Sequence, residues 1–486
     1  MDTDVVISGA GPTGLFLACE LALAGTAVRV LERRGRRHEQ SRALTLHPRS
    51  IEIMDLRGLA DRFLSRGRTV PGWHFAGLDR PLDFSRLDTR HGYTLFLEQV
   101  HTERILEERA RELGVEVAYQ HEVTGLTQDD AGVDVRVRTP DGESTVRAAF
   151  VVGCDGGDSR VRSSAGIGFP GSEATMTAML GDFAVVDQDA LAAAAGTRVL
   201  VVPLEGGLTR FVVTDPDRMR VPRSEPVTVD EFRESLTRMT GSSFGVDEPR
   251  WLSRFGNATR LADRYRAGRV FVAGDAAHIH FPAAGQGLNT GLQDAMNLGW
   301  KLAAEINGWA APGLLDSYHT ERHAAGRAVT GNTQAQTLLL QLTLVEEYQQ
   351  PVAALRELLD DLLAIPAANA RLAGLVSALD TSYATPGEDP FVGARLAGPP
   401  ADFALLHGGR FGFLELVGGG AAKAVSAGWG HRVEAATAAP HPGLDDLAEV
   451  LVRPDGHIAW VRRQSEVPSD ADREAALRRW AGPPSL

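Results

Sequence analysis

The chain has 486 residues, of which 43% are hydrophobic and 23% are charged, and its formal net charge is −13. This composition predicts a globular protein with roughly two to four domains. The negative charge argues against nucleic acid and anionic membranes as partners. No run approaches the roughly 18 apolar residues of a membrane span. Cys19 and Cys154 provide neither a disulfide framework nor a metal-ligand pair, and the acidic start is unlike a signal peptide. We therefore expect a cytoplasmic protein.

A dinucleotide-binding unit is predicted at the start of the chain. An apolar strand over residues 4–8 leads into a G-x-G-x-x-G turn and then a helix. The first glycine allows the tight turn, the second lets the backbone approach a diphosphate, and the third lets helix pack on strand. A second strand over 27–31 ends at Glu32, about twenty residues on, where an acid binds a ribose. The residues of the turn are Gly9, Gly11, Pro12, Thr13 and Gly14.

The next stretch is rich in arginine. Arg33 and its neighbours up to Arg37 fit a solvated basic loop or a phosphate site equally well, whereas Arg42 lies in a less polar context. Further along we expect a helix over 50–64, strands within 70–97 and a helix from Gln99 to Leu113. Strands over 115–119, 123–128, 133–138 and 144–150 suggest a β-meander.

A second acid-and-glycine motif follows that meander, in the sequence 150-FVVGCDGGDSRVR-162. Cys154 within it is read as a small core residue, because no base motif adjoins it. Residues 176–265 then form a second zone. Short β runs over 199–203 and 209–213, and a helix carrying Phe232 and Leu236, predict a sheet-and-helix domain.

A third motif, Gly274-Asp275, ends the buried strand over 270–273. A carboxylate at the carboxyl end of a parallel strand lies where open α/β sheets bind ligands. The loop behind it is rich in Pro and Gly, and a helix opens near Leu288. The free N–H groups of such a helix start stabilise an anion. By itself, this motif also fits an ordinary turn between strand and helix.

Helical patterning dominates from 313 to about 380. His319, Glu321 and His323 there have the order H-x-E-x-H and not H-E-x-x-H, so we interpret them as a solvated helix face and expect no metal site. A linker rich in Gly and Pro over 385–403 marks a boundary. The remaining tail alternates strand-like and helical runs and contains no cysteine.

Taken in order, the three motifs resemble those of the group A flavoprotein aromatic hydroxylases, the family of para-hydroxybenzoate hydroxylase and phenol hydroxylase. The match runs from residue 2 to about 330. Four further stretches resemble the larger hydroxylases of aromatic polyketide pathways, especially the angucycline type, whose tail is thioredoxin-like without redox cysteines. They are Asn257-Ala-Thr-Arg260, Ala277-His-Ile-His-Phe-Pro282, 293-QDAMNLGWK-301 and 452-VRPDGHIAW-460.

This resemblance implies FAD, NADPH as a transient electron donor, and hydroxylation of an electron-rich ring by oxygen through a flavin hydroperoxide. The turn glycines and Glu32 would hold the ADP half, Asp275 the ribityl or diphosphate region, and the backbone near Gly287 the flavin pyrimidine. The implied cofactor-binding residues are Gly9, Gly11, Pro12, Thr13, Gly14, Glu32, Arg33, Arg42, Gln99, Asp155, Arg160, Gly274, Asp275, Pro282, Gly285, Gly287, Leu288 and Asn289. No catalytic base is identified. We place Trp73, Phe183 and Phe211 near the substrate.

The fold class expected is α/β: a Rossmann-like FAD-binding domain with an inserted β-sheet substrate domain, a helical linker and a C-terminal thioredoxin-like domain. The expected segments are 1–175 (FAD, with 70–98 contributing to the substrate sheet), 176–265 (substrate sheet), 266–390 (FAD domain continued, plus helices) and 391–486 (tail). The predicted substrate is an aromatic polyketide, with a homo-oligomer left open. Two alternatives remain: an antibiotic-inactivating monooxygenase of the rifamycin type, or a non-catalytic flavin-bearing polyketide-binding protein.

Overall fold

The structure is a computed structural model that describes residues 1–484 apart from 185–190, 192–193, 195–196, 198 and 441. In this part of the chain, the largest sheet has eight strands in the order β18-β19-β11-β1-β2-β8, with β10 and β9 continuing from β11. Helix α1 (Pro12–Leu23) packs between this sheet and the helices α4 (Gln99–Glu112) and α7 (Gln286–Ile306). The strands are β1 (Thr3–Ser8), β2 (Val28–Glu32), β8 (Glu116–Tyr119), β9 (Glu122–Gln128), β10 (Val133–Thr139), β11 (Gly142–Gly153), β18 (Arg266–Ala267) and β19 (Val270–Val272).

The register of this sheet brings the three motifs to one edge. On β1, Ser8 lies beside Gly153 of β11, and Gly153 lies beside Val272 of β19, with all three strands parallel. Their carboxyl ends are therefore level. The Gly9 turn, the Cys154 turn and the Gly274 turn all leave the sheet at this edge, which is the ligand-binding edge of open α/β sheets.

The predicted meander is correct for β9, β10 and β11, which pair antiparallel in sequence order. The strand expected at 115–119 exists, but β8 pairs parallel with β2 at the far edge of the main sheet. Strand β11 belongs to both parts, because its first half pairs with β10 and its second half with β1 and β19. The meander is thus an extension of the nucleotide sheet.

Residues 45–97 form short strands beside this domain. β7 (Thr94–Phe96) pairs with β3 (Thr45–Leu46) and β4 (Arg68–Val70), and β5 (Gly72–Trp73) pairs with β6 (Leu82–Asp83). None of these described strands joins the substrate sheet, so the contribution expected of residues 70–98 is wrong. The helix expected over 50–64 is two helices, α2 (Pro48–Asp55) and α3 (Ala60–Leu64). Gly58, with φ of 66°, lies in the turn between them.

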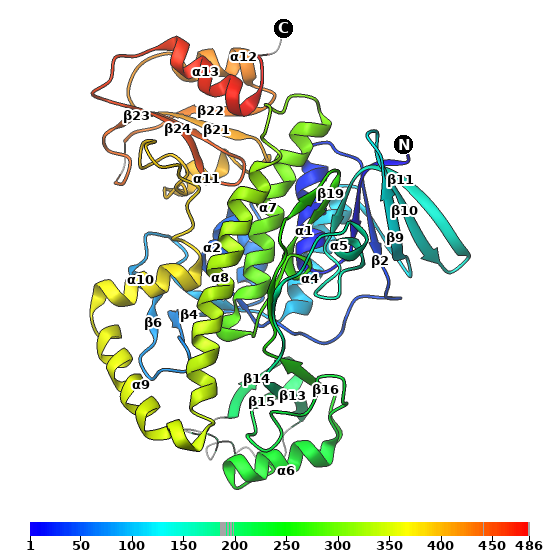
Figure 1. The fold of residues 1–486 in the computed structure, drawn as a ribbon. Helices are drawn as coiled ribbons and strands as arrows, with labels where there is room; N and C mark the ends of the chain where they lie inside the picture. The colour runs from blue at the N-terminus through cyan, green and yellow to red at the C-terminus, as the bar shows by residue number, and fades with distance from the viewer. Residues whose placement is uncertain (185–190, 192–193, 195–196, 198, 441, 485–486) are drawn as a thin grey trace.

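In the second zone, the described residues form a four-stranded antiparallel sheet covered on one face by a helix, at the bottom of Figure 1. A smaller sheet connects it to the nucleotide domain. The four strands are β14 (Val199–Pro203), β15 (Leu208–Val213), β13 (Thr177–Ala184) and β16 (Trp251–Gly256), and the helix is α6 (Val229–Thr240). The smaller sheet contains β12 (Gly171–Ser172), β17 (Thr259–Leu261) and β20 (His278–Ile279).

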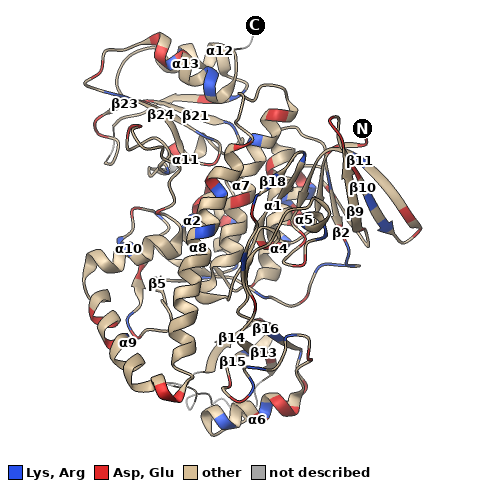
Figure 2. Ribbon diagram, viewed as in Figure 1, with Lys and Arg blue, Asp and Glu red and all other residues tan. Residues whose placement is uncertain are grey.

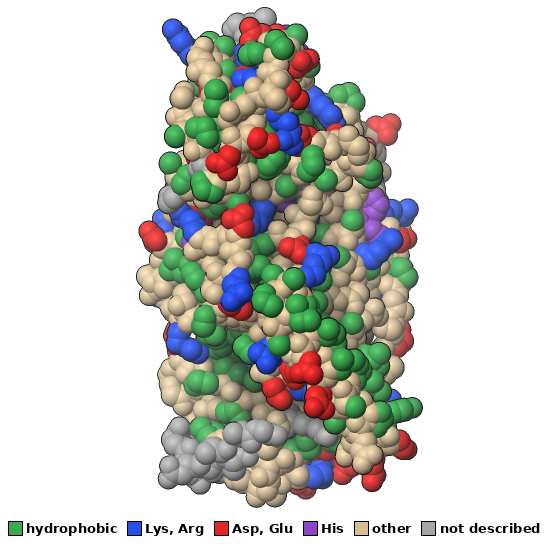
Figure 3. Space-filling model, turned by 90° about the vertical axis from the view of Figure 1, so that its left-hand side faces the viewer, with side chains coloured by type: hydrophobic (Ala, Val, Ile, Leu, Met, Phe, Trp, Pro, Cys, Tyr) green, Lys and Arg blue, Asp and Glu red, His purple; other side chains and the backbone are tan. Residues whose placement is uncertain are grey.

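Three helices form the side of the molecule at the left of Figure 1: α8 (Ser317–Leu342), α9 (Gln349–Leu363) and α10 (Pro366–Ser377). On α9, Leu355, Leu358 and Leu362 are 42–57% exposed. Figure 3 looks onto this side, where hydrophobic side chains lie at the surface between charged ones. No helix in the described ranges is long and apolar enough to cross a membrane.

The C-terminal domain, at the top of Figure 1, has a mixed sheet in the order β22-β21-β23-β24. β21 and β22 are parallel and joined by α12, whereas β23 and β24 are antiparallel, which is the strand order of a thioredoxin fold. The elements are α11 (Pro400–Ala404), β21 (Phe411–Glu415), α12 (Ala421–Trp429), β22 (Val433–Thr437), β23 (Leu447–Val452), β24 (Ile458–Arg463) and α13 (Asp470–Ala481). Both cysteines lie outside it and are free thiols. Burial raises the pKa of each, which suits core residues.

This domain is not a loosely attached module. Leu447, Val450 and Ile458 belong to the same hydrophobic cluster as Val5 and Ile7 of the nucleotide sheet. The predicted linker is also docked, since Leu396 is buried and its N–H donates to the carbonyl of Gly456. One apolar core therefore runs from the first strand into the tail.

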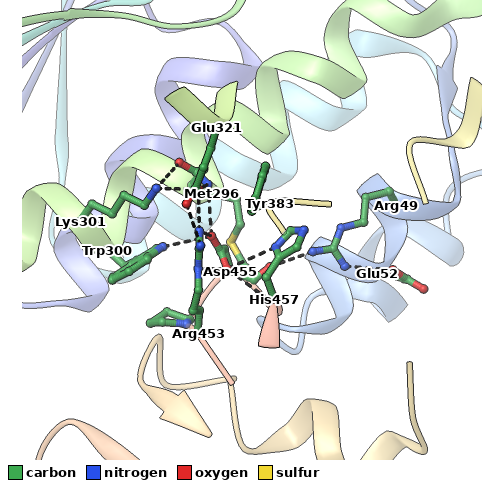
Figure 4. A network of polar contacts seen from close by, with 12 residues as sticks. Arg49, Glu52, Met296, Trp300, Lys301, Glu321, Tyr383, Arg453, Asp455 and His457 are labelled. Atoms are coloured by element: carbon green, nitrogen blue, oxygen red, sulfur yellow. Dashed lines mark hydrogen bonds and ion pairs between the residues drawn. The ribbon is translucent and has the colours of Figure 1, made fainter. Parts of the chain in front are cut away.

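A buried ionic network joins the same two parts (Figure 4). Glu321 on α8 accepts from Lys301 Nζ of α7 at 2.7 Å and from Arg453 Nη1 at 2.8 Å. Arg453 also pairs with Asp455, whose Oδ2 accepts from Trp300 Nε1 at 3.2 Å. Figure 2 shows the charged residues on α7 and α8 where these helices lie side by side. The charges balance, so each buried ion has a partner of opposite sign.

Candidate active site at the sheet edge

The first turn has the shape of a diphosphate cradle. A Cβ on Gly9 would overlap the carbonyl oxygen of Cys154, and one on Gly14 would overlap that of Gly9. At Gly11, by contrast, no heavy atom lies within 4 Å of a Cβ position. Helix α1 begins directly after Gly11 with no side-chain cap and no acid in its first turn, so its free N–H groups remain available. Open space beside an uncapped helix start fits an anionic diphosphate.

Glu32 fixes this turn from the neighbouring strand. Its side chain is buried, and its carboxylate accepts from the N–H of Ala10 at 2.9 Å and from that of Arg34 at 3.0 Å. The predicted ribose contact of Glu32 stays a prediction. Arg33, at the start of the basic stretch, is exposed.

Gln99 opens α4 and supports the segment that carries Arg42. Its Oε1 accepts from the N–H of Ala43 at 3.0 Å, and its Nε2 donates to Glu103. Arg42 is exposed, while its carbonyl accepts from Arg210 Nη1 of the second sheet at 3.2 Å. The Arg42 segment thus lies where the nucleotide domain meets the four-stranded sheet.

Asp155 has a local structural task. Its carboxylate accepts from Ser159 Oγ at 2.5 Å and from the N–H groups of Arg160 and Val161 at 2.8 and 3.1 Å. These bonds cap the short helix α5 (Arg160–Ser164). Burial raises the pKa of Asp155, although these hydrogen bonds favour the carboxylate and oppose the shift. The Arg160 side chain is exposed, and cofactor roles for both residues stay predictions.

Thr13 locks the first motif to the third. A Cβ on Gly274 would lie 2.7 Å from Thr13 Oγ1, and one on Gly291 would overlap the same oxygen. Only glycine at both positions leaves room for this side chain. The Gly9 turn, the Gly274 turn and α7 are therefore packed as one unit.

The Gly274 turn is held from behind by Asp294 of α7, a residue that sequence reasoning missed. Asp294 is fully buried, and its Oδ2 accepts from the N–H of Gly274 at 3.0 Å. His278 and Arg322 also bind this carboxylate, at 2.8 and 2.7 Å. Burial opposes its ionisation, yet Arg322 and His278 together outweigh burial and lower the pKa of Asp294. Asp275, next to this anchored glycine, is exposed at the ligand edge.

The loop before α7 contains two successive left-handed residues, Ala284 with φ of 53° and Gly285 with φ of 67°. For a residue with a Cβ this conformation costs roughly 1–2 kcal/mol. Asn289 stabilises the loop by donating to the carbonyls of Gly285 and Thr45 at 2.8 and 3.2 Å. Helix α7 starts at Gln286 with no side-chain cap and no acid in its first turn. Its open end includes the backbone of Gly287 and Leu288, and Pro282 is exposed beside it.

Two of the three predicted substrate residues are wrong. Phe183 and Phe211 are 0% exposed and pack with Phe232 of α6, on the covered face of the sheet. Trp73 is half-buried, and its Nε1 has no hydrogen-bond partner. Sequence alternation identifies the two faces of a strand but not which one the helix covers.

The other face of this sheet points toward the nucleotide domain. Leu180 and Val212 are paired across strands there, as are Asp182 and Arg210. Arg210 makes a buried bidentate ion pair with Asp182 at 2.8 Å and reaches the Arg42 carbonyl. On the same face, Phe255 contacts Phe281 of the loop before α7, with ring centroids 5.6 Å apart.

No group of side chains suited to a metal ion occurs in the described ranges. The interpretation of the H-x-E-x-H residues as a solvated face is wrong for Glu321, which forms the buried network of Figure 4. Burial opposes its ionisation, but Arg453 and Lys301 outweigh this effect and lower the pKa of Glu321 to about 2.

Comparison with known proteins agrees with these features. The "FAD binding domain" family matches residues 2–333, and the "Aromatic-ring hydroxylase, C-terminal" family matches residues 392–484. A rifampicin monooxygenase from Streptomyces venezuelae is 44% identical over 94% of this chain and 95% of its own length. The solved structure of OxyS anhydrotetracycline hydroxylase from Streptomyces rimosus superposes with a TM-score of 0.90 at 42% identity, covering 100% of both chains.

CabE, an aromatic hydroxylase from angucycline biosynthesis, gives a TM-score of 0.87 at 37% identity and also covers 100% of both chains. The resemblance stated from the three motifs is thereby confirmed. The chain belongs to the FAD-dependent aromatic-ring hydroxylases, a family of flavoprotein monooxygenases.

Proposed function

We propose that this protein hydroxylates an aromatic polyketide, with FAD as resident cofactor, NADPH as electron donor and oxygen as co-substrate. The observation that carries the proposal is the close packing of Thr13 against Gly274 and Gly291. This packing joins the Gly9 turn, the Gly274 turn and α7 into one unit at the ligand edge. In that unit two uncapped helix starts, those of α1 and α7, leave their N–H groups free.

Each end of this unit fits a different part of FAD. The open space at Gly11 and the start of α1 would hold the diphosphate, and Glu32 the ribose. Asp275 would accept hydrogen bonds from the ribityl chain, while Arg42 and Gln99 lie on the side facing the second sheet. The motifs supply hydrogen bonds, so we expect FAD to be held noncovalently and released by acid denaturation.

When bound, FAD would supply the oxygen activation, after reduction by NADPH. The chain itself would position the flavin and the substrate, stabilise negative charge and exclude water. The start of α7 would stabilise negative charge on the reduced ring. The apolar side chains of Leu180, Val212 and Phe255 would exclude water from the reacting ring. No side chain is assigned as catalytic base.

Two features support a large aromatic substrate. The chain matches a tetracycline-type and an angucycline-type hydroxylase over their whole lengths. The free face of the second sheet is rich in apolar side chains and meets the α7 loop through Phe255 and Phe281. We also propose a cytoplasmic location, NADPH as transient electron donor and no nucleic-acid partner, on the basis of composition and family.

The similarity to a rifampicin monooxygenase supports one rival, antibiotic inactivation. The deciding experiment follows NADPH oxidation and product mass with purified protein against tetracyclic intermediates, angucyclinones and rifamycins. We expect substrate-stimulated NADPH oxidation and a product heavier by one oxygen atom with a ring polyketide. Turnover of rifamycins alone would favour inactivation, and tight binding without oxygen uptake would favour a binding protein.

Asp275→Ala tests the cofactor site directly. Loss of a hydrogen bond to a charged group costs roughly 1.5–3 kcal/mol, so FAD affinity should fall about ten- to a hundredfold. The readout is the dissociation constant from flavin fluorescence. Asp141→Ala, at an exposed hairpin turn far from the motifs, is the matched control and should bind FAD normally. Full affinity in the Asp275 variant would remove this residue from the site.

A further inference from the structure

The loop before α7 has a left-handed backbone that must be stabilised by contacts with other segments. Ala284 has φ of 53° and ψ of 20°, the left-handed region that a residue with a Cβ rarely adopts, and Gly285 follows in the same region. Ala284 is fully buried, so a clear constraint from its surroundings is expected. The conformation of this pair sets the direction in which the first N–H groups of α7 point.

His47 provides this stabilising contact. The residue lies between β3 and α2, and its side chain is fully buried. Its Nε2 is 2.7 Å from the carbonyl oxygen of Ala284. A carbonyl can only accept, so Nε2 carries the proton and Nδ1 is left as an acceptor near Thr94 Oγ1 at 3.4 Å. Burial lowers the pKa of His47 to about 4, which keeps this neutral form at physiological pH.

The backbone of the same residue holds the other end of the loop. The N–H of His47 donates to Asn289 Oδ1 at 2.8 Å, and Asn289 Nδ2 donates to the Gly285 carbonyl at 2.8 Å. His47 thus fixes Ala284 directly and Gly285 through Asn289. The imidazole also meets Trp73 edge-on, with ring centroids 6.0 Å apart. It therefore lies between the segment of Trp73 and the start of α7.

We propose that His47 is a positioning residue of the cofactor site, which holds Ala284 left-handed and so aims the α7 N–H groups at the flavin; this rests on the proposed function. A histidine with only a packing role would be replaceable by any side chain of similar size. A positioning role requires a donor at the place of Nε2.

The test compares three replacements in the full-length protein. His47→Phe fills the space without a donor, His47→Asn is too short to reach the carbonyl, and His47→Gln keeps an N–H at similar reach. Readouts are the FAD dissociation constant and the reduction potential of the bound flavin. We expect the Phe and Asn variants to bind FAD at least tenfold more weakly and to have a more negative potential. The Gln variant should stay within about threefold of the wild type.

Two controls separate the outcomes. His91→Phe removes another buried histidine, which pairs with Asp55 away from the loop, and should leave FAD affinity unchanged. In His47→Phe/Ala284→Gly the left-handed residue no longer needs a hold, so part of the affinity should return. Wild-type affinity and potential in a folded Phe or Asn variant would overturn the inference, as would failure of both to fold. A wild-type protein that binds no FAD would instead refute the proposed function.

Discussion

At the residue scale, the first turn uses its glycines for two different reasons. Gly9 and Gly14 leave no room for a methyl group because backbone oxygens occupy the space, whereas the space at Gly11 is open to a ligand. The same sequence motif therefore contains positions that serve folding and a position that serves binding.

This difference predicts opposite phenotypes. Gly14→Ala should destabilise the fold by about 3 kcal/mol, because strand and helix must separate to admit the methyl group. Gly11→Ala should leave the unfolding midpoint almost unchanged and weaken FAD binding, because the methyl group enters the diphosphate space. Urea unfolding and flavin titration of both variants check the pair. Equal losses of stability would contradict the assignment.

At the scale of elements, α7 connects the whole site. Its first turn faces the ligand edge, Gly291 accommodates Thr13, Asp294 holds the Gly274 turn, and Lys301 joins the network to the tail. Tyr383 extends this connection, since its hydroxyl accepts from Arg322 Nη1 at 3.1 Å and its ring lies 4.3 Å from that of His457. A displacement of the tail should therefore change the position of the Gly274 turn.

Asp455→Ala tests how far the network supports α7. The change leaves Arg453 with one carboxylate fewer and Trp300 Nε1 without its acceptor. Removing one partner of a buried ion pair costs about 3 kcal/mol or more. Thermal unfolding should show this loss, while Asp472→Ala, an exposed acid on α13, should stay within about 0.5 kcal/mol. Equal melting temperatures would show that the network adds no stability.

At the scale of the whole molecule, the tail cannot be treated as a detachable unit. Removal of residues 401–486 would expose core side chains of the nucleotide domain and leave Glu321 with Lys301 but without Arg453. We therefore expect the truncated chain to aggregate or to unfold cooperatively at much lower denaturant, without retaining FAD. Size-exclusion chromatography and flavin content check this. A soluble, FAD-loaded fragment would show that the tail only covers the surface.

Stability should fall in mild acid because of two buried histidines. Burial lowers the pKa of His47 and His457 to about 4, with Asp455 beside His457 opposing the shift. Between pH 6.5 and about 4 the unfolded chain binds more protons than the folded chain, so acid favours unfolding. Each histidine contributes a slope of about 1.4 kcal/mol per pH unit.

The measurement is the unfolding free energy in urea at several pH values across that window. His457→Gln should flatten the decline by one such slope. Unchanged pH dependence in this variant would mean that His457 takes up its proton in the folded state as readily as in the unfolded one.

Local signals in the sequence were sufficient for the nucleotide turn, the Gly274 turn and the FAD-dependent hydroxylase family. These features depend on small residues at fixed spacing after short apolar strands, and such spacing is set by backbone sterics within one segment. The sequence alone also shows that the tail contains no cysteine and so cannot exchange disulfides.

Only the tertiary structure could decide which face of a strand meets the ligand and which distant segments share a site. Phe183 and Phe211 were misplaced because α6 covers their face of the sheet. His47 and Asp294 gave no signal, since their partners, Ala284 and Gly274, lie far away in the chain. Sequence periodicity indicates that a side chain is buried. Which residue it contacts depends on how distant segments pack together in the whole molecule.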